Sequence, residues 1–316
     1  MRTYVIIVRT LFLFTCLILT LLSVNGQSLY VKTFGNPAHK PLIFLHGGPG
    51  NNALSFEATT AQKLADHGFY VLVYDRRGEG RSVDLPSAYT FQQTFDDLNQ
   101  LLDSHYIRKA TLLGASFGGL LAVRYAAKYP ARVQNIVLIG ALVTLQDTYS
   151  TIIASSRKAY EAKKDTASLV QLNRLEASDR SSYDFRSACF QHASRNGFFD
   201  VPDRTVEAQQ LHAQLQTDTT YQGLQARRNN IASKAFHEHE RYSTLDNLPL
   251  LKKLKARGIG LFGIYGKNDG LYSPAQVEAV RRITGPARLQ YLDRCAHAPF
   301  LDQQTKFVNL LTRWLL

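Results

Sequence analysis

The sequence is poor in cysteine, methionine and tryptophan: its 316 residues include three cysteines, one methionine and one tryptophan. Cys16 lies in an apolar segment near the N-terminus, which leaves only Cys189 and Cys295 for the rest of the chain. One pair of cysteines is not the disulfide framework that holds small secreted domains together. The chain must therefore fold around a hydrophobic core, for which its length and its 45% of hydrophobic residues are ordinary.

The N-terminal apolar run is too short for a typical membrane-spanning helix. It covers residues 11–24, whereas a span needs ~20 residues. Arg2 and Arg9 precede the run, and residues 24–26 (VNG) place small residues where a signal peptidase cleaves. We therefore predict that residues 1–26 are a signal peptide and that the protein is exported, either periplasmic or secreted. An uncleaved anchor is the alternative, and beyond this leader we expect no membrane contact.

The sequence also lacks a nucleic-acid-binding module, an internal repeat and a low-complexity tract. A net charge of +12 attracts polyanions in principle. The basic residues are dispersed, however, and their clusters are short, as in residues 252–255 (KKLK). We interpret the charge as a contribution to solubility and expect no nucleic-acid partner.

What the sequence does contain is an alternation of strand-like and helix-like segments. Apolar or alternating runs predict strands at residues 29–34, 41–45, 69–74, 110–113, 133–139, 259–265 and 288–292. Helical spacing or helix-start signals predict helices at residues 95–105, 120–127, 274–283 and 300–316. This alternation is typical of a mostly parallel sheet flanked by helices, with functional loops at the carboxyl ends of the strands.

The alternation is interrupted between residues 144 and 248. Strand-like runs are missing there, and amphipathic segments predict helices at residues 168–175, 182–193 and 205–215. Because the α/β pattern resumes afterwards, we expect an inserted helical cap at 144–248. Residues 27–143 and 249–316 would then form one core.

A candidate nucleophile lies in residues 114–118 (GASFG), between a predicted strand and a predicted helix. In that context a Gly-x-Ser-x-Gly turn holds the serine in a strained conformation at the top of the sheet. An ordinary strand-to-helix turn has the same composition, so the motif alone leaves both interpretations open.

Two later residues complete a catalytic arrangement with Ser116. Asp269 and His297 each follow a predicted strand, and the order Ser, Asp, His matches a triad. The histidine would take the serine proton, and the aspartate would orient the imidazole. For Asp269 alone the alternative is an ordinary turn aspartate, and for His297 alone it is a loop histidine. The coincidence of all three at strand ends favours catalysis.

Acyl transfer at Ser116 also requires N–H donors for the oxyanion. We expect the backbone N–H groups of Phe117 and Gly48 to provide them, the latter from residues 46–50 (HGGPG), where glycine allows a close approach. His46 is interpreted as a structural member of this loop.

The candidate residues imply no metal and no organic cofactor. Residues 237–240 (HEHE) are the one stretch that merits consideration as a metal site. Alternate residues of a helix point to different sides, and no further histidine stands at zinc-site spacing, so we interpret the stretch as a solvated surface.

Residues 46–50 (HGGPG), 75–82 (DRRGEGRS) and 114–118 (GASFG) together resemble the α/β-hydrolase fold, and within it the proline iminopeptidase family of serine peptidases. The resemblance covers nearly the whole mature chain. It implies an α/β-hydrolase core with an inserted cap, and hydrolysis of an acyl bond through an acyl-enzyme formed by Ser116, Asp269 and His297.

The chain departs from that family in three places, of which one is its short mature N-terminus, where the first strand of the usual sheet is expected to be missing. Phe117 stands where the family usually has tryptophan, and the glutamate expected in the cap stretch 189–198 is absent. An aminopeptidase needs carboxylates near the free amine of its substrate. Glu207, Glu238 and Glu240 are candidates, with a solvated helix face as the alternative for each.

We therefore expect an exported serine hydrolase that acts on a small-molecule, peptide or ester substrate. The first hypothesis is a proline iminopeptidase-like aminopeptidase. A carboxylesterase or lactonase with the same triad is the alternative, and a non-catalytic α/β-hydrolase-fold binding protein is a third. Substrate-binding residues, oligomeric state and the pairing of the cysteines are not predicted.

Overall fold

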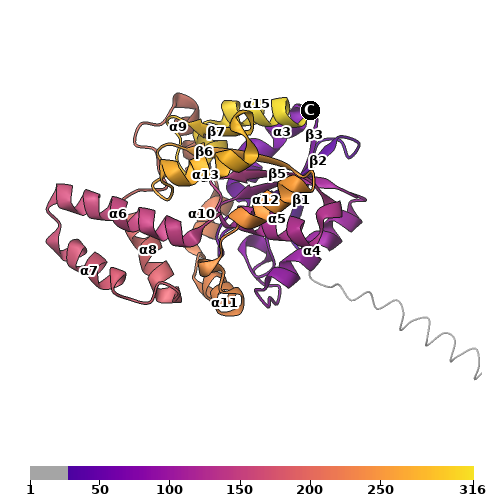
Figure 1. Cartoon of the computed structure of the whole chain (residues 1–316). Helices are drawn as coiled ribbons and strands as arrows, with labels where there is room; N and C mark the ends of the chain where they lie inside the picture. The colour runs from indigo at the N-terminus through magenta and orange to yellow at the C-terminus, as the bar shows by residue number, and fades with distance from the viewer. Residues whose placement is uncertain (1–27) are drawn as a thin grey trace, which may run out of the picture.

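Within residues 28–316, which the computed structural model describes, a seven-stranded sheet forms the centre of the molecule (Figure 1). The predicted signal peptide, residues 1–26, lies outside the described residues. In spatial order the strands are β1 (Val31–Phe34), β3 (Phe69–Tyr74), β2 (Lys40–Leu45), β4 (Ala110–Ala115), β5 (Val133–Ile139), β6 (Gly260–Gly266) and β7 (Leu289–Leu292). Strand β1 pairs antiparallel with β3, and every other pairing is parallel. The predicted strands and the mostly parallel sheet are confirmed.

Helices cover both faces of the sheet because successive strand residues point to opposite sides. Ile43 and Leu45 belong to one hydrophobic layer and Leu42 and Phe44 to the other. The first layer includes helices α4 (Phe91–Ser104), α5 (Phe117–Lys128), α12 (Leu248–Ala256) and α13 (Pro274–Thr284). The second includes α2 (Leu54–Phe56), the π-helix η1 (Glu57–Ala61), α3 (Gln62–Asp66), α14 (Pro299–Asp302) and α15 (Gln304–Leu315). Short 3-10 helices are η2 (Gly80–Ser82), η3 (Pro130–Arg132) and η5 (Pro286–Arg288).

Between β5 and β6 the chain forms a run of helices, which we call the helical insertion (residues 144–248). It consists of α6 (Leu145–Lys163), α7 (Thr166–Glu176), α8 (Tyr183–Arg195), α9 (Val206–Thr217), α10 (Thr219–Ala226), α11 (Ile231–Glu240) and the 3-10 helix η4 (Tyr242–Thr244). Helix α6 packs against α7 and α8, and these helices extend to one side of the sheet (Figure 1). The predicted helices are present as α7, α8 and α9, whereas α6, α10 and α11 are additional.

The prediction of one continuous helix over residues 300–316 is wrong. Helices α14 and α15 are separated at Gln303, whose backbone is non-helical (φ −141°, ψ 52°). The side-chain amide of Gln303 donates hydrogen bonds to the carbonyl oxygens of Asp293 and Arg294, both at 3.0 Å. Gln303 thereby anchors the loop that follows β7 at the point where the two helices are separated.

The parallel register brings the candidate loops to one edge of the sheet. Leu45 of β2 is paired with Gly114 of β4, and Ala115 with Ile139 of β5, so the segments that follow these strands leave the sheet side by side. In the described part of the chain no helix is long and apolar enough to cross a membrane. Cys189 and Cys295 are both buried free thiols.

Candidate active site

Ser116 occupies a sharp turn between β4 and α5. Its backbone has φ 51° and ψ −119°, outside the conformations that residues with a side chain usually adopt. The Ser116 N–H donates to the carbonyl oxygen of Ile139 at 2.9 Å, and the Ser116 carbonyl accepts from Leu142 N–H at 3.1 Å. The neighbouring β5 end thereby holds the strained turn from both sides.

The two glycines of the motif are required by space. A Cβ atom at Gly118 would collide with the carbonyl oxygen of Leu45, and one at Gly114 would lie 2.6 Å from the Cα atom of Gly119. The helix therefore packs directly against the strand ends, which explains the Gly-x-Ser-x-Gly pattern around Ser116.

Asp269 and His297 are in direct contact. The Asp269 Oδ2 atom and the His297 Nδ1 atom are 2.8 Å apart, and Asp269 is buried. The other carboxylate oxygen accepts from the Leu271 N–H at 3.0 Å. A buried carboxylate at Nδ1 favours the tautomer with the proton on that atom, which leaves Nε2 free to act as a base.

Aromatic side chains hold the His297 ring in place. Phe199 contacts it edge to face with ring centroids 5.3 Å apart, and Tyr272 stacks on it at 6.3 Å. The Tyr272 hydroxyl donates to the carbonyl of Gly140 at 2.7 Å. Phe199 belongs to the helical insertion, so this part of the chain contributes directly to the surroundings of the histidine.

Gly140 links the serine to the aspartate–histidine pair. It follows Ile139, whose carbonyl binds the Ser116 N–H. A Cβ atom at Gly140 would lie 3.4 Å from His297 Nδ1 and 3.6 Å from Asp269 Oδ2. The end of β5 therefore contacts Ser116 on one side and the Asp269–His297 pair on the other.

The predicted oxyanion loop lies against Ser116. A Cβ atom at Gly47 would be 3.2 Å from Ser116 Cβ and 3.8 Å from Ser116 Oγ. The next residue, Gly48, has φ +111°, a value suited to glycine. Phe117 is the first residue of α5, so its N–H has no acceptor within the helix. Phe117 thus directly follows the serine, and Gly48 is one residue beyond the glycine that lies against it.

A buried ion pair holds this loop in place. Arg76 donates to the carbonyl oxygens of His46 and Gly47 at 2.5 and 2.6 Å, and it pairs through two nitrogens with Glu79 at 2.9 Å. Glu79 in turn accepts from the Gly50 N–H at 2.7 Å. We call Arg76 and Glu79 the loop clamp. It gives a structural reason for the motif at 75–82, because Arg76 and Glu79 of that motif hold the loop at 46–50.

His46 is a neutral part of the same framework. Its Nε2 atom accepts from the Arg76 N–H at 3.1 Å, and Nδ1 lies 2.9 Å from the Gly47 carbonyl oxygen. Burial, together with the charge of Arg76, lowers the pKa of His46 to about 4. This environment agrees with the structural role expected for His46.

A second charged cluster holds the segment after β3. Arg81 binds Asp75 at 2.7 Å and Glu57 at 2.7 Å, and Asp75 also accepts from the Ala53 N–H at 2.8 Å. Burial opposes ionisation of Asp75, but the hydrogen bonds and charge of Arg81 outweigh it and lower the pKa of that carboxyl.

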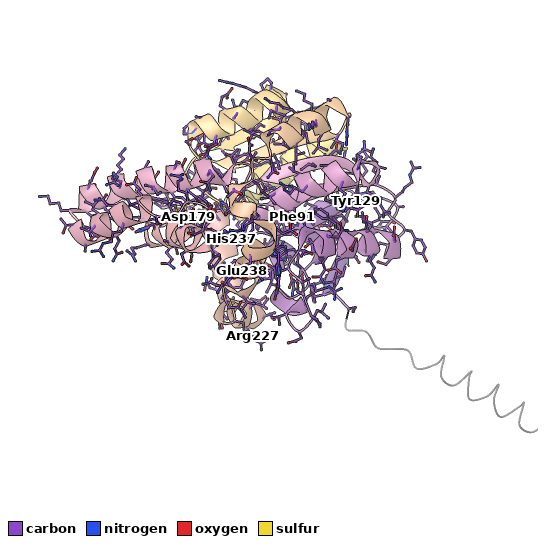
Figure 2. The ribbon with its side chains drawn as sticks, turned by 60° about the horizontal axis from the view of Figure 1, so that its bottom comes forward. Phe91, Tyr129, Asp179, Arg227, His237 and Glu238 are labelled. Carbon is purple, nitrogen blue, oxygen red and sulfur yellow. The ribbon has the colours of Figure 1, made fainter. Side chains whose placement is uncertain are left out.

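The carboxylates considered for amine recognition are engaged elsewhere or exposed. Glu207 accepts from Thr305, Glu238 is exposed beside Lys234, and Glu240 accepts from the Phe91 N–H at 2.6 Å. Figure 2 shows Glu238 and His237 on α11. Within the helical insertion, all of which the structure describes, no aspartate or glutamate is buried.

A family model described as the alpha/beta hydrolase fold matches residues 40–304. The chain belongs to the α/β-hydrolase family. Proline iminopeptidases from Lactobacillus helveticus and Lactobacillus delbrueckii subsp. bulgaricus are 25% and 27% identical to this α/β hydrolase over 306 residues, covering 92% of it and 95% of each relative.

Solved structures with the same fold include two kinds of protein. The proline iminopeptidase-related protein from Thermus thermophilus has a TM-score of 0.65 at 21% identity and covers 91% of this chain and 92% of its own. An esterase from Exiguobacterium antarcticum has a TM-score of 0.61 at 20% identity, covering 92% and 96%. These similarities show the fold, whereas the chemistry depends on the residues of the site.

Proposed function

We propose that this α/β hydrolase is a serine hydrolase that cleaves an acyl bond through an acyl-enzyme. The observation that carries the proposal is the Asp269–His297 hydrogen bond beside the strained turn of Ser116. His297 Nε2 accepts the Ser116 Oγ proton as the oxygen attacks the acyl carbon, and Asp269 stabilises the resulting imidazolium. The proton then passes to the leaving group, and a water activated in the same way releases the acid.

The oxyanion of each tetrahedral intermediate binds the backbone N–H groups of Gly48 and Phe117. Support comes from Phe117, which directly follows Ser116, and from Gly48, one residue beyond Gly47, which lies against Ser116. The start of α5 adds a dipole that favours negative charge there. The loop clamp keeps the loop rigid, so the donors are oriented before the substrate arrives.

We further propose that the helical insertion (residues 144–248) acts as a cap over this site. Phe199 contacts His297, and the Gly270 N–H, next to Asp269, donates to the carbonyl of Phe198 at 3.0 Å. Phe236 and Tyr242 pack on Phe117 with ring centroids 5.4 and 5.1 Å apart. These contacts join the insertion to the core beside Ser116 and His297.

The geometry favours a carboxylic ester over a substrate with a free amine. The carboxylates of the insertion lie exposed or half-exposed, where water weakens their interaction with an ammonium group. The second candidate is a proline iminopeptidase-like aminopeptidase, which is supported by the names of relatives that are similar over nearly their full length.

A fluorophosphonate probe and two chromogenic substrates test the proposal. We expect the probe to label Ser116, and we expect p-nitrophenyl butyrate to be hydrolysed faster than proline p-nitroanilide. Ser116→Ala removes labelling and turnover, whereas Ser194→Ala, an exposed serine of α8, retains both. Faster cleavage of the anilide would establish the aminopeptidase. A folded protein without labelling would be a binding protein.

We also propose that the protein is exported after removal of residues 1–26. The support is the sequence pattern of the leader. N-terminal sequencing of the protein recovered outside the cytoplasm should begin at Gln27. A start at residue 1 or 2 in a membrane fraction would indicate an anchor.

A further inference from the structure

Arg186 of helix α8 is a buried cation without an acidic partner. The residue is only 9% exposed, and its Nε atom has no hydrogen-bond partner. Within residues 28–316 no carboxylate forms an ion pair with it. Its guanidinium lies over the rings of Phe190, Tyr183 and Tyr242, at 4.9, 5.9 and 5.4 Å from their centroids.

Aromatic faces alone do not satisfy a guanidinium. They attract its charge through their π-electrons, but the N–H donors lie in the plane of the group and need acceptors. Burying an unpaired donor of a charged group is costly, so the Nε atom of Arg186 is expected to gain an acceptor when one is supplied.

Carboxylates elsewhere near this region are already engaged. The charge of Glu79 acts on the pKa of Tyr242, but Glu79 pairs with Arg76. The charge of Asp179 acts on the pKa of His237, but Asp179 accepts a hydrogen bond from Ser181. Figure 2 shows Asp179 and His237 together on the side of the molecule where α11 comes forward. Neither carboxylate forms an ion pair with Arg186.

The other polar groups around Arg186 are neutral and have free hydrogen-bonding capacity. The Tyr149 hydroxyl and the His237 Nδ1 atom are buried without partners. Burial and the charge of Arg186 lower the pKa of His237, and burial raises that of Tyr242 to about 12. A ligand that reaches Arg186 would thus find its positive charge beside neutral hydrogen-bonding groups.

Two aromatic contacts connect Arg186 with opposite sides of the catalytic site. Phe190, beneath the guanidinium, stacks with Phe199 at 6.4 Å, and Phe199 contacts His297. On the other side Tyr242 contacts Phe117, the residue after the nucleophile. Arg186 is therefore linked by contacting rings both to His297 and to the residue that follows Ser116.

We propose that Arg186 binds a carboxylate at the far end of the acyl group, so that the enzyme hydrolyses half-esters of dicarboxylic acids. This inference rests on the proposed function, since it assigns the acyl group of the same reaction. The carboxylate pairs with the guanidinium, while the aromatic rings contact the methylene groups between the two ends.

Two p-nitrophenyl esters of nearly equal shape test the inference: the monoester of glutaric acid, which carries the carboxylate, and the hexanoate, which does not. We expect the wild-type kcat/KM to be at least tenfold higher for the glutarate ester. In Arg186→Met the ratio of the two kcat/KM values falls about 100-fold, mainly through KM for the glutarate ester. Arg195→Met, at the exposed end of the same helix, keeps the wild-type ratio.

A binding measurement separates charge recognition from catalysis. Glutarate should inhibit hexanoate ester hydrolysis competitively, at least tenfold more strongly than the neutral glutaramide. Arg186→Lys, which keeps the charge, should retain part of this inhibition and provides the test if Arg186→Met does not fold. A wild-type preference for the neutral ester, or an unchanged ratio in folded Arg186→Met, would overturn the inference. If the proposed function itself fails, the result is different from these outcomes: neither ester is hydrolysed and Ser116 is not labelled.

Discussion

Arg76 at the edge of the sheet and Arg186 in the helical insertion are both buried, but their surroundings differ. Arg76 has its counter-ion within four residues, in Glu79, and four of its hydrogen bonds run to groups of the chain. Arg186 has three aromatic rings and an unpaired Nε atom. The guanidinium of Arg76 is hydrogen-bonded within the fold, whereas Arg186 has an N–H donor left to bind an acceptor.

The contrast between Arg76 and Arg186 distinguishes a structural charge from a candidate ligand-binding charge in this α/β hydrolase. An ion pair whose hydrogen-bonding groups are all paired, such as Arg76–Glu79, holds a loop and gains no stability from a further partner. An unsaturated cation near a reactive centre is a candidate for substrate recognition. The core of the molecule would then supply the chemistry, and the insertion would supply the selectivity. Variants in the core should therefore lose turnover, whereas variants in the insertion should lose selectivity between substrates.

The largest effect is expected in the core, at the aspartate of the proposed triad. Asp269→Asn should reduce kcat for both esters about 10⁴-fold, because an amide at this position favours the wrong histidine tautomer. Single-turnover kinetics with p-nitrophenyl esters measure the loss. Asp246→Asn, an exposed aspartate of the insertion, is the matched control. Near-wild-type turnover in Asp269→Asn would show that the acid lies elsewhere.

The two arginines themselves should respond to the same substitution with different stability changes. Arg76→Met leaves the Glu79 carboxylate buried and unpaired, so the free energy of unfolding should fall by about 3–5 kcal/mol. Arg186→Met removes an unpaired charge and keeps apolar contacts, so the change should be less than about 1 kcal/mol. Urea denaturation of both variants measures the contrast. Similar losses in the two would mean that Arg186 is a structural cation like Arg76.

The sequence predicts the core well because its signals are local. Runs such as Phe69–Tyr74 are buried along their whole length, and a strand of apolar residues needs no information from the rest of the chain. Ser116 and Asp269 could be proposed because each follows such a strand, and His297 because it follows the partly buried strand β7. Their order along the chain was sufficient to suggest that they meet.

The insertion is less predictable because tertiary contacts determine it. Helix α6 contains serine, threonine and β-branched residues of modest helix propensity, and it is held by burial of Tyr149, Ile152 and Tyr160. Arg186 in an amphipathic segment looks like a solvated side chain until the packing around it is known. Only the structure shows the aromatic rings that surround it.

A smaller effect is expected from pH, again in the core. The pKa of His46 is about 4 in the folded protein and about 6.5 when unfolded, so the unfolded state binds more protons between these values. The free energy of unfolding should therefore fall as the pH drops from about 6.5 towards 4, by about 3 kcal/mol at most from this group.

Urea denaturation across this pH range provides the measurement for His46. In His46→Asn the slope of stability against pH should become shallower, whereas His239→Asn, an exposed histidine of the insertion, should keep the wild-type slope. An unchanged slope in His46→Asn would mean that other groups carry the pH dependence.

The smallest effect is expected at a carboxylate of the insertion. Glu238 is exposed on α11 (Figure 2), with its nearest cation, Lys234, at 3.9 Å. Because water screens an exposed charge, Glu238→Gln should change kcat/KM for either ester less than about twofold. Proline p-nitroanilide provides the sharper comparison. If Glu238 bound the amine of an aminopeptidase substrate, the variant would lose anilide turnover while retaining ester turnover. Selectivity would then rest on an exposed carboxylate of the insertion instead of its buried arginine.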